Sequence, residues 1–199
     1  MFFYFILLFC PFNFQTKLLV LFLKKMPMKR WILLTIIVFN FQHLQAQTTT
    51  DSNQPAYLRF PTIPPFKLLK VDSLTWLTKD DIKKNRRTII MFFSPSCDHC
   101  KHQIQDILAE ISKFKDIEIV MATFQPFGEM KEFYSYYRIA DHPNIKIGRD
   151  EKYVLPPYYK MQSLPYLALY DKKGNYITHF EGNQKISTIL TAFDAKDKE

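Results

Sequence analysis

Two cysteines, Cys97 and Cys100, are the residues of this 199-residue chain best suited to chemistry. They end the stretch Phe-Phe-Ser-Pro-Ser-Cys-Asp-His-Cys, residues 92–100. Two thiols at this spacing share one face of a helix, so a disulfide between them is geometrically reasonable. The loop that such a bridge closes is too short to stabilise a fold much through chain entropy. The pair therefore predicts a redox-active dithiol, and a purely structural bridge is the weaker alternative.

The residues around the pair predict the elements that position it. An apolar run at 88–93 is typical of a buried strand, and Ser94-Pro95 of a tight turn. Apolar residues then recur at helical spacing up to an expected helix end near Phe114. Because unpaired amides and the helix dipole stabilise a thiolate at a helix start, we expect Cys97 to attack a substrate disulfide. Cys100 would then release the substrate by attacking the mixed disulfide.

The two residues between the cysteines are expected to modulate this chemistry. A protonated His99 would favour the thiolate, whereas the charge of Asp98 would oppose it. The two effects have opposite signs, so the sequence leaves the redox potential open.

The remaining pattern predicts one α/β domain with a mixed central β-sheet flanked by helices. Its aromatic helical stripe, which includes Phe133 and Tyr137, is expected to pack in the core. In chain order, the predicted elements are a hairpin at 68–71 and 74–77, a helix at 79–84 opened by a Thr78–Asp81 capping box, the strand and helix that carry the dithiol, a strand at 117–123 joined by a parallel crossover, a helix at 129–139, a short strand at 145–147, a turn-rich helix at 151–159 broken by Pro156-Pro157, a hairpin at 166–170 and 176–180, and a helix at 186–193.

The charge distribution points to an exported protein. The net charge is +8, but five of the excess positive charges lie in the first 46 residues, which contain no acid. The remaining +3 does not indicate a nucleic-acid partner. Residues 1–46 are expected to be a leader with a signal peptide. Its true start would be Met28, or Met26, and its cleavage would follow Ala46; an uncleaved anchor is the alternative.

The leader prediction sets the expected domain limits. Residues 47–64 would be a flexible lead-in and residues 65–195 the folded domain. Cys10 would leave with the leader, so Cys97 and Cys100 would be the only thiols of a periplasmic or otherwise extracytoplasmic protein, either free or associated with the membrane.

With these features, the chain resembles the thioredoxin superfamily, in particular the exported TlpA/ResA-like thiol-disulfide oxidoreductases. The resemblance rests on the signal peptide, on the motif at residues 92–100 and on Leu164-Pro165 before the last hairpin and helix. It implies a thioredoxin-like fold and an enzyme that exchanges thiols and disulfides. It further implies that Pro165 is a cis-proline beside the dithiol and that the backbone of Leu164 binds substrate peptide.

The resemblance also implies partners and shows one departure. We expect a monomer that reduces disulfides in exported proteins, with electrons from a membrane-bound donor, and the alternative is a disulfide oxidase or isomerase. Thioredoxins place a buried acid six residues before the first active-site cysteine, and here that residue is Met91. The group that transfers protons therefore stays unassigned.

Two other classes of function compete with the enzyme. A zinc or copper site could draw on Cys97, His99, Cys100 and His102, but successive helical positions do not converge on one point. A non-catalytic binding domain would have no need of both cysteines. No cofactor is expected: Lys101 follows Cys100 where haem attachment requires histidine, and four glycines leave little room for a phosphate-binding loop.

Overall fold

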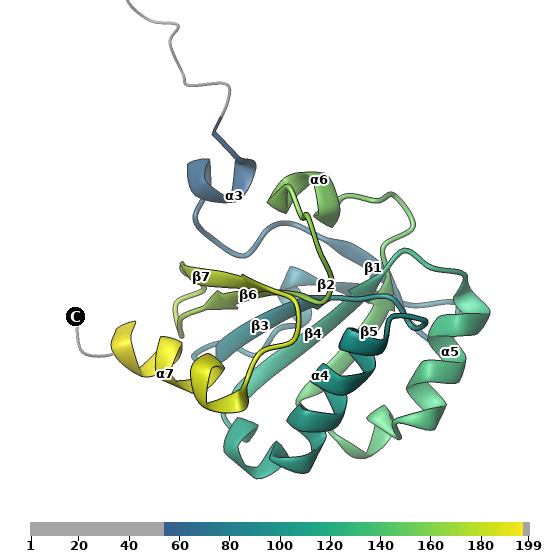
Figure 1. The fold of residues 1–199 in the computed structure, drawn as a ribbon. Helices are drawn as coiled ribbons and strands as arrows, with labels where there is room; N and C mark the ends of the chain where they lie inside the picture. Colours follow the sequence, from purple (N-terminus) through teal and green to yellow (C-terminus); the bar gives the residue numbers. More distant parts are fainter. Residues whose placement is uncertain (1–53, 197–199) are drawn as a thin grey trace, which may run out of the picture. The chain divides into compact units, whose positions relative to one another are not determined.

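The protein folds around a seven-stranded mixed sheet with the strand order β2-β1-β5-β4-β3-β6-β7. The computed structural model describes residues 54–196. The predicted leader at 1–46, with its start at Met28, and the first part of the lead-in at 47–64 lie outside these residues. Helices cover both faces of the sheet (Figure 1). The predicted α/β class with a mixed central sheet is confirmed.

The elements follow the chain in a largely alternating order. The strands are β1 (Lys67–Leu69), β2 (Trp76–Thr78), β3 (Arg87–Phe92), β4 (Ile117–Thr123), β5 (Ile145–Arg149), β6 (Tyr166–Tyr170) and β7 (Tyr176–Glu181). The helices are α3 (Ala56–Arg59), α4 (Asp98–Ala109), α5 (Phe127–Tyr136), α6 (Leu155–Tyr159) and α7 (Ile186–Lys196), with short 3-10 turns η1 (Lys79–Asp81), η2 (Ile111–Phe114) and η3 (Ile139–Asp141). No helix among residues 54–196 is both long and apolar enough to cross a membrane.

The strand that precedes the dithiol, β3, lies inside the sheet between β4 and β6. β3 pairs in parallel with β4, as the strand-helix-strand pattern predicts, and antiparallel with β6. In this register Phe92 lies opposite Tyr166. The end of β3 and the beginning of β6 therefore meet at one edge of the sheet, which is where the dithiol follows β3.

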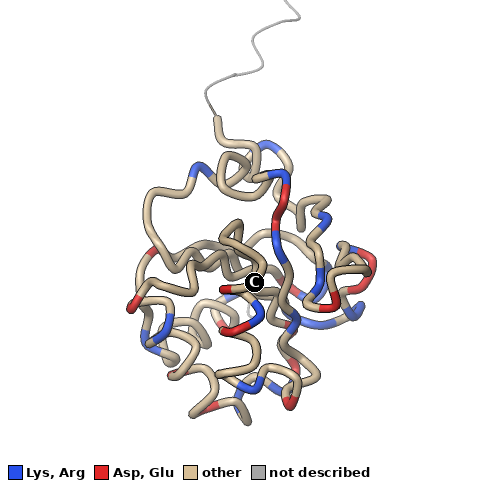
Figure 2. Tube along the Cα trace, turned by 90° about the vertical axis from the view of Figure 1, so that its right-hand side faces the viewer, with Lys and Arg blue, Asp and Glu red and all other residues tan. Residues whose placement is uncertain are grey.

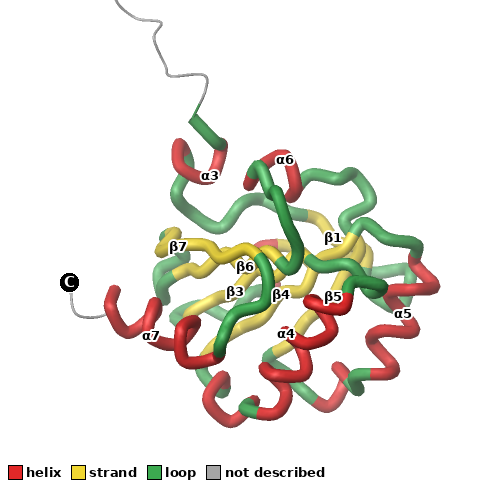
Figure 3. Tube along the Cα trace, viewed as in Figure 1, coloured by secondary structure: helices red, strands yellow, loops and turns green. Residues whose placement is uncertain are grey.

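The alternation of side chains along the strands builds a core on each face of the sheet. Ile89, Met91 and Phe93 belong to the core that includes residues of α4, α5 and α7. Ile90 and Phe92 belong to the other core, which includes residues of α3 and α6. Both faces of β3 and β4 are buried, which is why these strands are apolar almost without interruption. Figure 3 shows the two helical layers with the sheet between them.

Two predicted helices are shorter in the structure. The helix expected at 79–84 is only η1. The Asp81 carboxylate accepts hydrogen bonds from the Thr78 backbone N–H and hydroxyl, but Ile82 is extended and packs, partly buried, against the core. The helix expected to end near Phe114 ends at Ala109. Its continuation is the tighter turn η2, which buries Phe114 and presents its carbonyl to Asn144 at 2.9 Å.

Other boundaries also differ. Pro156 and Pro157 begin α6 instead of breaking it, because the first helical turn does not need their missing N–H groups. The expected helix at 129–139 runs from Phe127 to Tyr136, and Arg138 then adopts a left-handed conformation.

The chain before the expected boundary at residue 65 is folded in part. α3 lies within the lead-in, and its Tyr57 is buried, with ring centroids 5.2 Å from Tyr176 and 5.9 Å from Tyr159. The aromatic surface available on this face of the sheet thus orders a segment that its polar and proline-rich composition predicts to be flexible.

Charged residues of both signs are interspersed over the side of the molecule seen in Figure 2. One carboxylate among the described residues, that of Glu118 in β4, is fully buried and faces three cations. Lys146 lies 2.7 Å from it, and Lys83 and Arg86 lie 3.6 Å from it. Glu118 pairs in the sheet with Thr88, at the end of β3 remote from the dithiol.

Candidate active site

The turn that carries the dithiol is fixed at both ends. Phe93, just after β3, donates its N–H to the Ala122 carbonyl at 3.0 Å, and its buried ring lies 4.6 Å from the ring of Phe133. Cys97 donates its N–H to the Ser94 carbonyl at 3.1 Å. The predicted strand, turn and helix are therefore present, and the backbone of the turn holds Cys97 at the start of α4.

Cys97 is the N-cap residue of α4. Its backbone is extended, with φ −79° and ψ 119°, and its sulfur accepts a hydrogen bond from the Cys100 N–H at 3.4 Å. The side chain is partly exposed. An N-cap sulfur receives the unpaired amides and the positive end of the helix dipole, which suits a thiolate that must meet a substrate disulfide.

Cys100 lies one helical turn further and is fully buried. It belongs to the same core as Met91 and Ile104. Burial, reinforced by the hydrogen bond to the Cys97 sulfur, raises the pKa of the Cys100 thiol far above its usual range. The two sulfurs thus differ sharply in access, and burial disfavours the thiolate form of Cys100.

The two residues between the cysteines point to solvent. Asp98 has an 81% exposed side chain and forms an ion pair with Lys101 at 3.0 Å. The hydrogen bond from Lys101 lowers the pKa of the Asp98 carboxyl. His99 is exposed as well. Neither side chain makes a described hydrogen bond to a cysteine, so the modulating roles of Asp98 and His99 stay predictions that would act through charge.

The loop before β6 lies beside the dithiol turn. The Leu164–Pro165 peptide bond is cis, as the resemblance implies. Because Phe92 pairs with Tyr166, Pro165 lies at the level where β3 gives way to the dithiol turn. Pro165 accepts a hydrogen bond from the Gly182 N–H at 2.9 Å, whereas within residues 54–196 the Leu164 backbone has no hydrogen-bond partner.

Met91 stands, fully buried, where thioredoxins have an acid. The buried acids of the described chain are Glu118 and Asp150, and neither is hydrogen-bonded to a cysteine. Glu118 forms ion pairs with its three cations, and the Asp150 carboxylate accepts a hydrogen bond from the Leu155 N–H at 2.8 Å. Residues 54–196 thus offer no buried carboxylate in place of the missing one.

The four residues considered as metal ligands do not converge. Cys100 is buried in the core, while His99 and His102 are exposed. Among residues 54–196, no three histidine, cysteine, aspartate or glutamate side chains are grouped so as to hold a metal ion.

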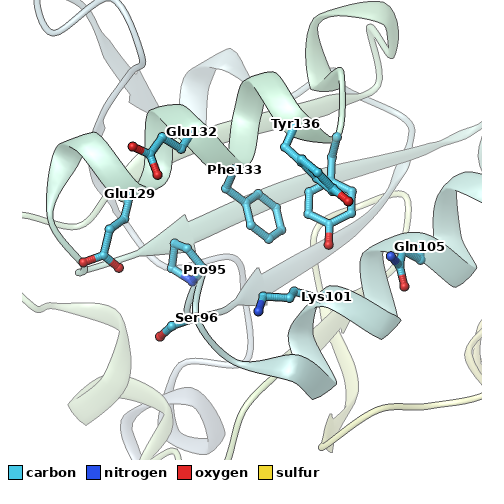
Figure 4. A pocket seen from close by; sticks show the side chains of 9 residues that line it. Pro95, Ser96, Lys101, Gln105, Glu129, Glu132, Phe133 and Tyr136 are labelled. Carbon is cyan, nitrogen blue, oxygen red and sulfur yellow. The ribbon is translucent and has the colours of Figure 1, made fainter.

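A groove beside the dithiol turn was not predicted from the sequence. It has a volume of about 600 Å³ and lies between the turn, α4 and α5. Figure 4 shows its lining side chains, with Glu129 and Glu132 at one end and Tyr136 at the other; the lining residues are Pro95, Ser96, Lys101, Gln105, Glu129, Glu132, Phe133, Tyr136 and Tyr137. Phe133 is buried in the core, as the aromatic stripe predicts, but Tyr136 is 77% exposed. The signal in the sequence was the pair of acids three residues apart on the same helix as that stripe.

Several solved structures have a similar fold. A secreted Mycobacterium tuberculosis disulfide oxidoreductase homologous to E. coli DsbE is 15% identical, covers 66% of this chain and 96% of its own, and gives a TM-score of 0.55. StoA from Bacillus subtilis is 17% identical, with 66% and 98% covered and a TM-score of 0.50. Copper-bound ScoI from Arabidopsis thaliana is also 17% identical, with 64% and 92% covered and a TM-score of 0.50. At these identities the likeness concerns the fold alone.

The comparison with protein families is more specific. No curated protein sequence matches the chain. The family model described as a thioredoxin-like domain matches residues 78–196, a range that contains the dithiol turn and the cis-proline loop. The predictions of a thioredoxin-like fold and of thioredoxin-superfamily membership are confirmed: the chain belongs to the thioredoxin-like domain family.

Proposed function

We propose that the protein is an extracytoplasmic thiol-disulfide oxidoreductase that reduces disulfides in exported proteins through Cys97 and Cys100. The observation that carries this proposal is the unequal placement of the two sulfurs. Cys97 is partly exposed at the N-cap of α4, and Cys100 is buried one turn later, with its N–H directed at the Cys97 sulfur. Membership of a thioredoxin-like family supports the same reaction class.

The reaction consists of two exchanges. The Cys97 thiolate attacks one sulfur of the substrate disulfide, forms a mixed disulfide and expels the other substrate sulfur as a thiolate. Cys100, once deprotonated, attacks the Cys97 sulfur and releases the second substrate thiolate. Two electrons and, after protonation, two protons reach the substrate, and the Cys97–Cys100 disulfide is left on the protein. A dithiol donor must then reduce this disulfide, a role we assign to a membrane-bound partner.

The cis-proline loop is the proposed binding site for the substrate backbone. The free N–H and C=O of Leu164 can pair with an extended peptide that lies across the dithiol turn, as a strand adds to a sheet edge. The pairing of Phe92 with Tyr166 holds this loop next to the end of β3. Exchange would then take place on a peptide held by backbone contacts, which suits substrates of varied sequence.

The location outside the cytoplasm is supported by the sequence. A basic and then apolar segment in residues 28–46 has the features of a signal peptide. The similar Mycobacterium tuberculosis protein is described as secreted. A reductant at such a site would act on proteins that oxidise after export.

Two cysteine variants test the reaction. Cys97→Ser is expected to abolish reduction of a peptide disulfide, because the attacking sulfur is lost. Cys100→Ser is expected to accumulate a mixed disulfide between Cys97 and the peptide, visible by mass spectrometry, because the releasing thiol is absent. Full activity in both variants would refute the dithiol mechanism.

The redox potential tests the direction. Equilibration of the protein with glutathione buffers is expected to give a potential well below about −200 mV, as a reductant requires. A value near about −120 mV would instead identify an oxidase.

A further inference from the structure

The groove between the dithiol turn, α4 and α5 has two chemically different ends. Glu129 and Glu132 lie at the end nearer Pro95 and Ser96, and Tyr136 lies at the end nearer Gln105 (Figure 4). Phe133 forms part of the wall between these ends. The groove thus combines a carboxylate end with an aromatic end.

The two glutamates are unpaired. Both are exposed, and neither has an ion-pair or hydrogen-bond partner within residues 54–196. The one cation that lines the groove, Lys101, is already bound to Asp98 at 3.0 Å. The groove therefore carries two carboxylates that have no ion-pair partner among residues 54–196.

The groove is also next to the reacting atom. Pro95 and Ser96 line it and immediately precede Cys97, whose sulfur receives the substrate. Neighbouring residues of an extended peptide are separated by about 3.5 Å, so the groove lies within reach of residues close to a substrate cysteine bound at Cys97. A substrate side chain that enters the groove would contact its lining residues while the exchange takes place.

We infer that this groove selects polypeptide substrates with a lysine or arginine close to the cysteine that Cys97 attacks. A basic side chain matches it in both parts. Its aliphatic stem can lie along Phe133 and Tyr136, and its charged group can reach the Glu129 and Glu132 carboxylates. This inference rests on the proposed function and adds a substrate class to it.

The test compares three peptide disulfides that differ only in the residue next to one cysteine, which is lysine, glutamine or glutamate. Their reduction by the full chain, previously reduced, is followed by rapid mixing. Because a lysine also makes the neighbouring sulfur a better leaving group, each rate is divided by the rate of the same peptide with dithiothreitol. After this correction, the lysine peptide is expected to react roughly threefold or more faster than the glutamine peptide, and the glutamate peptide more slowly.

Variants assign this preference to the groove. Glu129→Gln with Glu132→Gln is expected to remove the difference between the corrected rates of the lysine and glutamine peptides. Glu132→Lys is expected to favour the glutamate peptide. Asp116→Asn is the matched control, because Asp116 is likewise exposed and has no ion-pair partner among the described residues, but precedes β4 at the end remote from the dithiol. The preference should persist in this control and weaken in high salt.

Several results would overturn the inference. Equal corrected rates for the three peptides, or a preference that survives in the double variant, would show that the groove does not select charge. A concentration-dependent dimer of the wild type that is lost in the double variant would assign the groove to a second copy of the chain. Failure of the wild type to reduce any of the peptides would instead refute the proposed function itself.

Discussion

At the scale of single residues, a one-turn spacing gives the two thiols opposite environments. Cys97 caps α4 and is partly exposed, whereas Cys100 lies inside the core. Burial raises the pKa of the Cys100 thiol, so this thiol is protonated at neutral pH. Met91 provides no carboxylate to remove the proton. In the proposed reaction, we therefore expect the second exchange, in which Cys100 must ionise, to depend strongly on proton concentration.

We expect release from the mixed disulfide to accelerate with pH. The thiolate is the nucleophile, and well below the raised pKa its fraction grows about tenfold for each pH unit. The rate of peptide release from Cys97 should therefore rise about tenfold for each pH unit, or about a hundredfold from about pH 6 to about pH 8, as measured by quenched-flow mass spectrometry. Cys100→Ser should show no release at any pH. A release rate that does not change with pH in the wild type would mean that another group takes up the proton.

At the scale of elements, α4 is held by more than its apolar face. Gln103 is fully buried on this helix and makes two bonds to the loop before α7: its amide nitrogen donates to the Gln184 carbonyl at 3.2 Å, and its oxygen accepts the Gln184 N–H at 2.6 Å. A polar residue at a core position of a helix is costly unless it is paired in this way. The pair of bonds joins the helix that carries the dithiol to the C-terminal part of the domain.

Gln103→Ala is expected to lower the free energy of unfolding by about 2 kcal/mol, since it leaves the backbone groups of Gln184 unpaired in a part-buried site. Urea denaturation of the reduced protein measures this change. Gln105→Ala, an exposed position on the same helix, is the control and should change stability by less than about 0.5 kcal/mol. Equal stabilities of the two variants would show that the tether contributes nothing.

At the scale of the whole molecule, the β1–β2 hairpin extends the sheet beyond its parallel strands β3, β4 and β5. β1 joins β5 through the pair Leu69 and Arg149. The backbones approach closely here: a Cβ atom on Gly148 would lie 2.7 Å from the Cβ of Leu68 and 3.2 Å from the Leu69 carbonyl oxygen. Gly148 therefore allows the hairpin to join the sheet and to bury Leu68 against the second core.

Gly148→Ala is expected to destabilise the fold by about 2 kcal/mol, because the contact with the backbone of β1 can be relieved only by moving the hairpin. Gly128→Ala in α5 is the matched control. Nothing lies within 4 Å of its added Cβ, and alanine favours a helix by up to about 1 kcal/mol over glycine. Urea denaturation should thus move the two midpoints in opposite directions, and a shared direction would contradict this account of the hairpin.

The sequence by itself was enough to predict the central strands of this protein and the dithiol turn. Continuous apolar runs fixed β3 and β4, and the cysteines at the beginning of the following periodic segment placed the dithiol at a helix start. These signals are local, since they depend on residue order within one element and its turn. The cis bond before Pro165 came from the family resemblance, because the preference for this isomer is not visible in the residues themselves.

The tertiary structure decided what depends on residues far apart in the chain. The folding of α3 follows from aromatic partners more than 100 positions away, and the early end of the 79–84 helix from the core that receives Ile82. The groove requires the dithiol turn to lie beside α5, so the spacing of Glu129 and Glu132 on one helix could not by itself assign a role to them. Sequence periodicity tells which face of an element is buried, but only packing tells what that face, or the exposed one, meets.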